Sequence, residues 1–237
     1  MSQGEIKVVI NNEKVLLNSG TNSLHKEDNK MNILGNGCIL GGKYDEEISV
    51  LGKATIEENL HCDSLSCTGL VEGKSELICD NKLYVEGNVS LEGVIKSKSI
   101  NVTGCFQVKG DVFAEKCIIE GAVESEKITS EIIEIVLSDN VKSAVTYVSG
   151  KKILIKRKSD CLDKKKFFFR KKNKYEETHM LIAEQIVGND VSVEFTKSNR
   201  VAGDDVKIGK NCVIDYVQYK DTIEIHDTSV VKKIERI

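Results

Sequence analysis

The sequence predicts an all-β protein, a parallel β-helix (solenoid) with about 17 residues per coil. Three observations predict this fold: a composition rich in β-branched residues, a glycine that recurs about every 17 residues, and an alternation of apolar and polar residues within each repeat. β-Branched side chains prefer the pleated surface of a sheet, whereas alanine leads the helix scale. The 237 residues include 25 Val and 25 Ile against 6 Ala, and they include no proline. Because proline cannot donate a hydrogen bond to a neighbouring strand, its absence also fits a sheet.

The glycine repeat sets the length of one coil. Its six members recur at spacings of 17 or 18 residues and are Gly35, Gly52, Gly69, Gly87, Gly104 and Gly121. Around each glycine we compare six positions: two and four residues before it, and two, four, eight and ten residues after it. Of these 36 positions 28 are apolar, whereas the 40% apolar composition predicts about 14. Residues that alternate in this way point to one face of a strand. We expect one coil per repeat, with each glycine at a bend that needs positive φ or close backbone approach.

Residues 1–30 are predicted to form an N-terminal arm and linker. Apolar residues alternate on both sides of the dipeptide Asn11-Asn12, which favours a hairpin or an arm. The stretch 20–32 is polar and is predicted to be a linker. The arm therefore precedes the coils rather than belonging to them.

Residues 31–155 are predicted to form a first group of β-helix coils, and residues 181–237 a second group. In the last repeat of the first group the alternation fades, because the positions eight and ten residues after Gly121 are polar. The end of the chain carries Ile234 and Ile237, which do not make an obvious polar cap. Since a coil without a cap has an unpaired edge, the sequence predicts that copies associate through their ends.

Residues 156–180 interrupt the coils and are predicted to be a basic-aromatic loop or insertion. The formal net charge is −3, yet residues 151–174 hold twelve Lys and Arg and two acids, a local net of +10 that leaves −13 elsewhere. The residues that we select as candidate contacts to an anionic surface are Lys164, Lys165, Lys166, Phe167, Phe168, Phe169, Arg170, Lys171 and Lys172. Such an asymmetry suggests an anionic partner or a contact with an acidic face.

Three interpretations of this basic segment are open. Basic side chains near an anionic membrane leaflet contribute about 1 kcal/mol each, and adjacent phenylalanines could insert at the interface. Nucleic acid would offer phosphates and bases to the same residues, and we favour it less than a membrane. The third interpretation is a solvated loop whose phenylalanines cover the β-helix.

Several classes of function receive no support from the residues. The sequence contains no run of 18 apolar residues, so it predicts no membrane-spanning helix. The first residues lack the features of a secretion signal. We therefore expect a cytoplasmic protein whose cysteines are reduced. His61 and Cys62 lie near Cys67, but both cysteines fall on inward positions, so no metal site is predicted. No phosphate-binding glycine loop and no Ser-His-Asp or Cys-His set is evident, so we predict no cofactor, no catalytic residue and no enzyme activity.

The short motifs of the repeat resemble those of a known family. They are Leu65-Ser-Cys-Thr-Gly69, Val85-Glu-Gly87, Val102-Thr-Gly104 and Val108-Lys-Gly110. Together with the tail, from Ala183-Glu-Gln-Ile-Val-Gly188 to Tyr219-Lys-Asp221, they resemble the bactofilins, bacterial polymer-forming cytoskeletal proteins, and in particular the longer Firmicute-type members. The resemblance covers roughly residues 31–237.

This resemblance implies a right-handed parallel β-helix that assembles end to end into filaments without nucleotide. It also implies filaments that lie at the inner face of the cell membrane and scaffold other proteins. The main partner of each chain is then another copy of the same chain. Two alternatives remain. One is an acyltransferase-like enzyme of the hexapeptide type, for which residues 208–214 offer a single match. The other is a monomeric β-helical binding module that presents its long faces.

Overall fold

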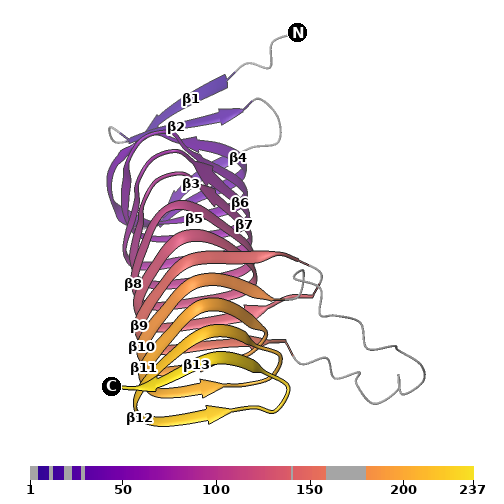
Figure 1. Cartoon of the computed structure of the whole chain (residues 1–237). Coiled ribbons are helices and arrows are strands. Elements are labelled where there is room, and N and C mark those ends of the chain that lie inside the picture. Colours follow the sequence, from indigo (N-terminus) through magenta and orange to yellow (C-terminus); the bar gives the residue numbers. More distant parts are fainter. Residues whose placement is uncertain (1–4, 11–12, 19–22, 28–29, 140, 159–179) are drawn as a thin grey trace, which may run out of the picture.

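The computed structural model describes residues 5–10, 13–18, 23–27, 30–139, 141–158 and 180–237. All regular elements in these ranges are β-strands, and most of them wind into a solenoid of about 11 turns with about 17 residues per turn (Figure 1). The predicted all-β parallel β-helix is confirmed. The described part of the chain has no apolar helix of membrane-spanning length.

The described residues form thirteen strands. Three short strands come first: β1 (Glu5–Ile10), β2 (Glu13–Asn18) and β3 (Ser23–Glu27). The first group of coils contains β4 (Lys30–Ile39), β5 (Gly42–Ile56), β6 (Leu60–Gly73), β7 (Leu77–Leu91), β8 (Ile95–Leu137) and β9 (Ser143–Arg157). The second group contains β10 (Leu181–Val193), β11 (Thr196–Ile208), β12 (Val213–Ile225) and β13 (Val230–Arg236). From β4 onward, each strand pairs in parallel with the next along the chain.

The core consists of columns in which equivalent residues of successive coils lie one above the other. Val50 pairs with Cys67, Cys67 with Val85, and Val85 with Val102. All four side chains are 0–2% exposed. Because neighbouring strands lie about 4.8 Å apart, each side chain contacts the equivalent one in the coil above and in the coil below. The inward positions that the alternation predicts are therefore the core of this stack.

The alternation does not fade after Gly121; it shifts by one residue. Ile128 and Ser130 are buried, whereas the positions that the repeat would place inside are the partly exposed Thr129 and the exposed Glu131. Since side chains alternate with a period of two, a shift of one residue exchanges the inner and outer sets. The coil thus continues through the segment where the sequence pattern weakens.

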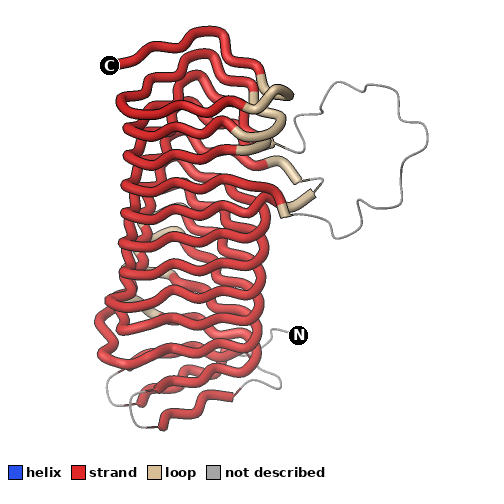
Figure 2. The backbone as a smooth tube through the Cα atoms, turned by 90° about the horizontal axis from the view of Figure 1, so that it is seen from below, coloured by secondary structure: helices blue, strands red, loops and turns tan. Residues whose placement is uncertain are grey.

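One corner of the solenoid changes its construction along the axis. In the first coils a glycine of the repeat forms this corner within a continuous strand. Ser138 follows β8 and donates its backbone N–H to the carbonyl oxygen of Gly121 at 3.3 Å, so it lies over the glycine column. Ser138, Lys158, Glu194, Gly209 and His226 each donate a backbone N–H to an earlier coil at this corner. Figure 2 shows the described loops of this part of the chain gathered on one side of the solenoid. The basic segment therefore leaves the side of the solenoid at Lys158 and returns at Met180.

The N-terminal arm contains the expected hairpin and one further strand. β1 and β2 pair antiparallel, with Val8 opposite Val15. The prediction that 20–32 is a linker is wrong in part, because β3 lies in it and pairs antiparallel with β4, which begins at Lys30. The polar sequence of β3 does not predict a strand, because its strand conformation depends on pairing with the edge of β4.

Candidate functional site

The six glycines of the repeat have a structural role at the corner of the solenoid. All have positive φ, between 95° and 142°. A Cβ atom on Gly104 would lie 1.9 Å from the carbonyl oxygen of Gly87, and the same contact recurs along the column, at 2.2 Å for Gly52 and 1.8 Å for Gly121. These positions thus combine a backbone conformation that favours glycine with a close approach between coils.

The candidate basic-aromatic contact residues, Lys164 to Lys172, lie outside the described residues, so their membrane role stays a prediction. The residues just before them are described. Lys158 pairs with Glu120, and Arg157 pairs with Asp139. The Arg157 guanidinium also lies 5.3 Å from the ring centroid of Phe195. Acidic and aromatic groups of neighbouring coils therefore hold the chain to the solenoid up to Lys158.

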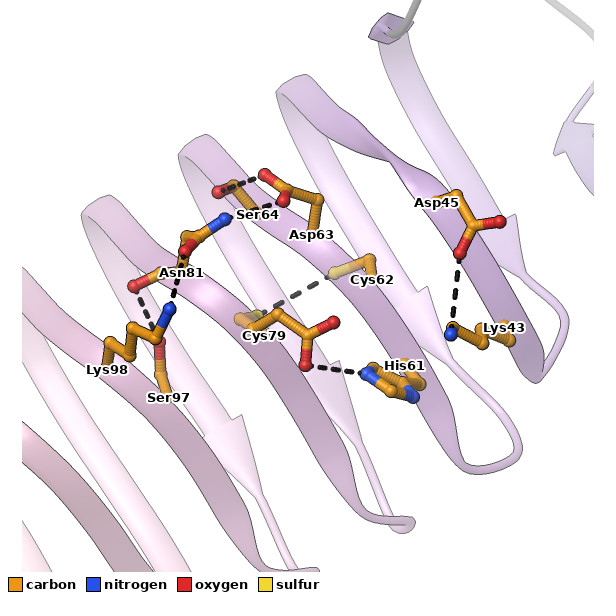
Figure 3. Close-up of polar contacts among 11 residues, drawn as sticks. Lys43, Asp45, His61, Cys62, Asp63, Ser64, Cys79, Asn81, Ser97 and Lys98 are labelled. Atoms are coloured by element: carbon orange, nitrogen blue, oxygen red, sulfur yellow. Dashed lines mark hydrogen bonds and ion pairs between the residues drawn. The ribbon is translucent and has the colours of Figure 1, made fainter.

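The histidine and cysteines considered as metal ligands point in different directions. His61 bonds Asp80 on the outer surface, with 2.7 Å between Nε2 and Oδ1, and this hydrogen bond lowers the pKa of the Asp80 carboxyl. Cys62 and Cys79 face each other in the core, with their sulfur atoms 3.7 Å apart (Figure 3). Cys67 is buried in another column. In the described residues, no group of three or more His, Cys, Asp or Glu is arranged to hold a metal ion.

The outer faces carry ion pairs between coils. A hollow of about 490 Å³ lies where Gln107 donates to Glu124 at 2.9 Å and Lys109 binds Glu92 at 2.8 Å. The Lys109 hydrogen bond lowers the pKa of the Glu92 carboxyl. These polar groups are satisfied by each other across successive coils, as expected for a solvated face of a solenoid.

The N-terminal end of the solenoid is closed by the arm. β2 and β3 pair with the outer edge of β4, with Val15 opposite Ile39 and Leu24 opposite Ile33. In the first coil Met31 is 2% exposed, and Ile33 and Ile39 are fully buried. Its core columns therefore end beneath the chain's own arm.

The C-terminal end is open. Among the described strands, β13 pairs only with β12, and this pairing spans residues 213–219 of β12. Ile208 is 1% exposed, but Ile225, its partner in the next coil, is 39% exposed. Likewise Val217 is fully buried, and its partner Ile234 is 48% exposed. The exposure rises because none of the described strands covers these two columns on this side.

We define the open coil end as β13 together with residues 221–225 of β12. It combines a row of backbone N–H and C=O groups at a strand edge with the exposed side chains of Ile225 and Ile234. Such an edge templates further strand pairing unless it is covered or charged. Repeat proteins that remain monomeric end in a polar capping repeat. Here β13 carries the charged residues Lys232, Lys233, Glu235 and Arg236, but the core positions Ile225 and Ile234 remain apolar and partly exposed. The open coil end is therefore a candidate site for association with another strand edge.

Comparison of the chain with protein-family models, with curated proteins and with solved structures finds no match. The function is therefore inferred from the fold and from the two ends of the solenoid.

Proposed function

We propose that this chain is a self-assembling scaffold protein whose subunits associate through the ends of the solenoid and build filaments without nucleotide. The observation that carries the proposal is the open coil end, where Ile225 and Ile234 are 39% and 48% exposed at the end of otherwise buried columns. Fully burying an exposed large aliphatic side chain contributes about 1.5–3 kcal/mol, so covering two that are 39% and 48% exposed contributes somewhat less than half of this for each. A partner that covers both must also pair with the free edge of β13.

A second copy of the chain meets both requirements. Its coils have the same outline, the same column positions and the same spacing between strands, so a coil stacked on β13 continues the existing ladder. The resemblance of the repeat motifs to the bactofilin family supports the same proposal, including a scaffold at the inner face of the cell membrane. A subunit with two such ends would form a filament, and a subunit with one would form a pair.

Assembly of this kind requires no nucleotide, because strand pairing and apolar burial supply the free energy. We expect the purified protein to form assemblies larger than the monomer to the same extent with and without ATP. Sedimentation and negative-stain electron microscopy over a range of protein concentrations measure this. A strict requirement for ATP would contradict the proposal.

The variant Ile234→Lys tests the surface itself. A lysine at the open coil end must be desolvated when a second copy covers it, so association should fall by at least about tenfold, the effect of one uncompensated buried charge at a conservative 1.4 kcal/mol. The fold should persist, because Ile234 is already 48% exposed in the single chain.

The matched control is Leu51→Lys. Leu51 is 58% exposed on β5, far from the open coil end, so this variant should associate like the wild type with an unchanged circular dichroism spectrum. If Ile234→Lys also associates like the wild type, the open coil end is not the interface.

The same measurements separate the alternatives. A protein that stays monomeric at every concentration would favour the β-helical binding module. A compact trimer without filaments would favour the acyltransferase-like enzyme. Either result would replace the scaffold proposal.

A further inference from the structure

Core positions at the two ends of the solenoid have very different surroundings. At the N-terminal end Met31 and Ile33 are 2% and 0% exposed, and at the C-terminal end Ile225 and Ile234 are 39% and 48% exposed. The difference comes from the arm, since β2 and β3 lie against β4, while β13 has a neighbour among the described strands on one side only. One end is thus covered and the other is not.

The arm pairs with the solenoid in a way that no coil does. Every coil from β4 onward adds in parallel to the one before it, whereas β2 and β3 both run antiparallel to β4. The strand direction shows that the arm does not continue the repeat. It occupies the edge on which another coil would otherwise stack.

The arm also covers this edge in two short pieces. Residues 15–17 of β2 pair with 37–39, and β3 pairs with 30–34, so neither strand pairs with the corner at Gly35 and Asn36. On its other edge β4 pairs with β5 along its full length, 30–39. A complete coil would therefore make a longer ladder with β4 than the arm makes.

We propose that the N-terminal arm, β1 to β3, is a displaceable cap, and that the terminal coil of a second copy competes with it for the edge of β4. This inference rests on the proposed association through coil ends. With the arm in place the subunit has one association end, and assembly stops at a pair joined at the open coil ends, because a single isologous contact closes on itself. With the arm displaced the subunit has two association ends, and assembly continues into filaments.

The cap sets the concentration at which filaments form. The apparent affinity of an end is its intrinsic affinity multiplied by the fraction of chains in which that end is accessible. A cap that is closed in nine chains of ten would raise the concentration needed for filaments by about tenfold, and a more stable cap would raise it further. Releasing the arm should therefore lower this concentration by at least that factor.

The first test compares the full chain with a chain that lacks residues 1–29. Circular dichroism and thermal melting establish whether the shortened chain folds. Sedimentation and negative-stain microscopy over a concentration series then give the filament threshold. At the concentration at which the shortened chain first forms filaments, we expect only pairs from the full chain. The full chain should form filaments at a concentration at least about tenfold higher.

The second test holds the arm closed within the full chain. The register places Leu16 of β2 opposite Cys38 of β4. Opposed residues of antiparallel strands have Cα atoms about 4.5–5.5 Å apart, which suits a disulfide bond. Oxidised Leu16→Cys should link to Cys38, as peptide mass spectrometry would verify, and should form pairs but no filaments. Reduction should restore the behaviour of the wild type.

A matched control places the added cysteine elsewhere in the arm. Lys7 of β1 lies opposite Leu16 and not opposite Cys38, so Lys7→Cys adds one thiol without a link to β4. Oxidation should leave its assembly unchanged. If the shortened chain does not fold, Leu16→Cys and Lys7→Cys test the cap without it. Equal filament formation by oxidised and reduced Leu16→Cys overturns the cap, and so does the absence of filaments under both conditions.

The variant Ile234→Lys separates failure of the cap from failure of end association. If full and shortened chains assemble equally and Ile234→Lys abolishes both assemblies, the cap is wrong and end association stands. If Ile234→Lys changes neither assembly, association through the open coil end is itself wrong. Filaments from the shortened chain alone, lost with Ile234→Lys, support both.

Discussion

At the scale of single residues, the glycine column shows what a sequence period can predict. The spacing of the repeat predicted a bend with positive φ or close approach, and Gly104 has both, with φ of 138° and Gly87 directly beneath it. Gly42 separates the two causes. It has the same φ of 138°, but a Cβ there would have its nearest neighbour, Tyr44 Cε2, at 4.0 Å. The 17-residue repeat includes Gly104 and not Gly42, but it shows neither that the two glycines share a φ nor that only Gly104 has backbone directly beneath it.

Gly42→Ala and Gly104→Ala should therefore differ in stability although the chemical change and φ are the same. Gly42→Ala should cost about 1–3 kcal/mol for the unfavourable backbone conformation alone. Gly104→Ala should cost more than about 4 kcal/mol, because the methyl group must also displace the backbone of the next coil. Urea denaturation of both variants measures the difference. Equal losses would mean that the coils can move apart at no cost.

The inward cysteines show the same link between position and environment. The alternation predicted that Cys67 and Cys117 lie inside, and both are buried. Burial raises the pKa of the Cys117 thiol to about 12 and that of Cys67 to about 11, from an ordinary value of 9.0. A thiol whose pKa is raised by folding stabilises the fold fully below pH 9. This contribution is lost as the pH rises from 9 towards the folded value, since the unfolded chain ionises first.

We therefore expect the free energy of unfolding to fall above pH 9, with Cys117 contributing about 2 kcal/mol of the loss by pH 10.5. Cys117→Val removes the ionisable group while keeping an apolar side chain of similar size, so its stability should fall less between pH 8 and pH 10.5. Urea melts of the wild type and the variant at both pH values measure this. An identical pH dependence in the two proteins would show that Cys117 does not contribute.

At the scale of elements, the sequence predicts a strand wherever packing within the coil defines it. β4 to β7 follow the repeat because their apolar residues alternate, but β3 has the sequence Ser-Leu-His-Lys-Glu, in which no alternation marks a strand. Its strand conformation depends on pairing with β4, and the polar residues of β3 do not indicate this pairing. The shift to Ile128 and Ser130 after Gly121 was not predicted either, because fixed offsets from a glycine assume the same number of residues in every coil.

At the scale of the whole molecule, the candidate site is the C-terminal end of the solenoid, which is exposed, whereas the arm covers the N-terminal end. The sequence predicted the open end from Ile234 and Ile237, which are 48% and 67% exposed. It could not predict that the arm covers β4, because a hairpin joined to a repeat has no local signal for the edge on which it folds. It did locate the basic segment, and the structure adds that this segment leaves from the corner that the glycines and later connections share.

Lys158 and Met180, the described residues that border the basic segment, lie on the side of the solenoid rather than at an end. We therefore expect that residues 164–172 leave the coil ends available for assembly. The six Lys and Arg of residues 164–172 in a single copy would give weak, salt-sensitive attraction to anionic lipid, and the three phenylalanines would add an apolar contribution that salt does not screen. Many linked copies would bind one membrane together, so that assembly strengthens the weak contact.

We therefore expect assembled protein to sediment with anionic liposomes more strongly than the Ile234→Lys variant, which should not assemble. Replacing Phe167, Phe168 and Phe169 with Ser should weaken sedimentation by about tenfold or more, since each interfacial aromatic contributes a free energy that many copies multiply. Filament formation and melting temperature should stay unchanged in this triple variant. Equal binding to neutral liposomes would remove the electrostatic contribution. A lower melting temperature in the triple variant would instead show that the phenylalanines cover the solenoid, because only side chains that pack on the fold stabilise it.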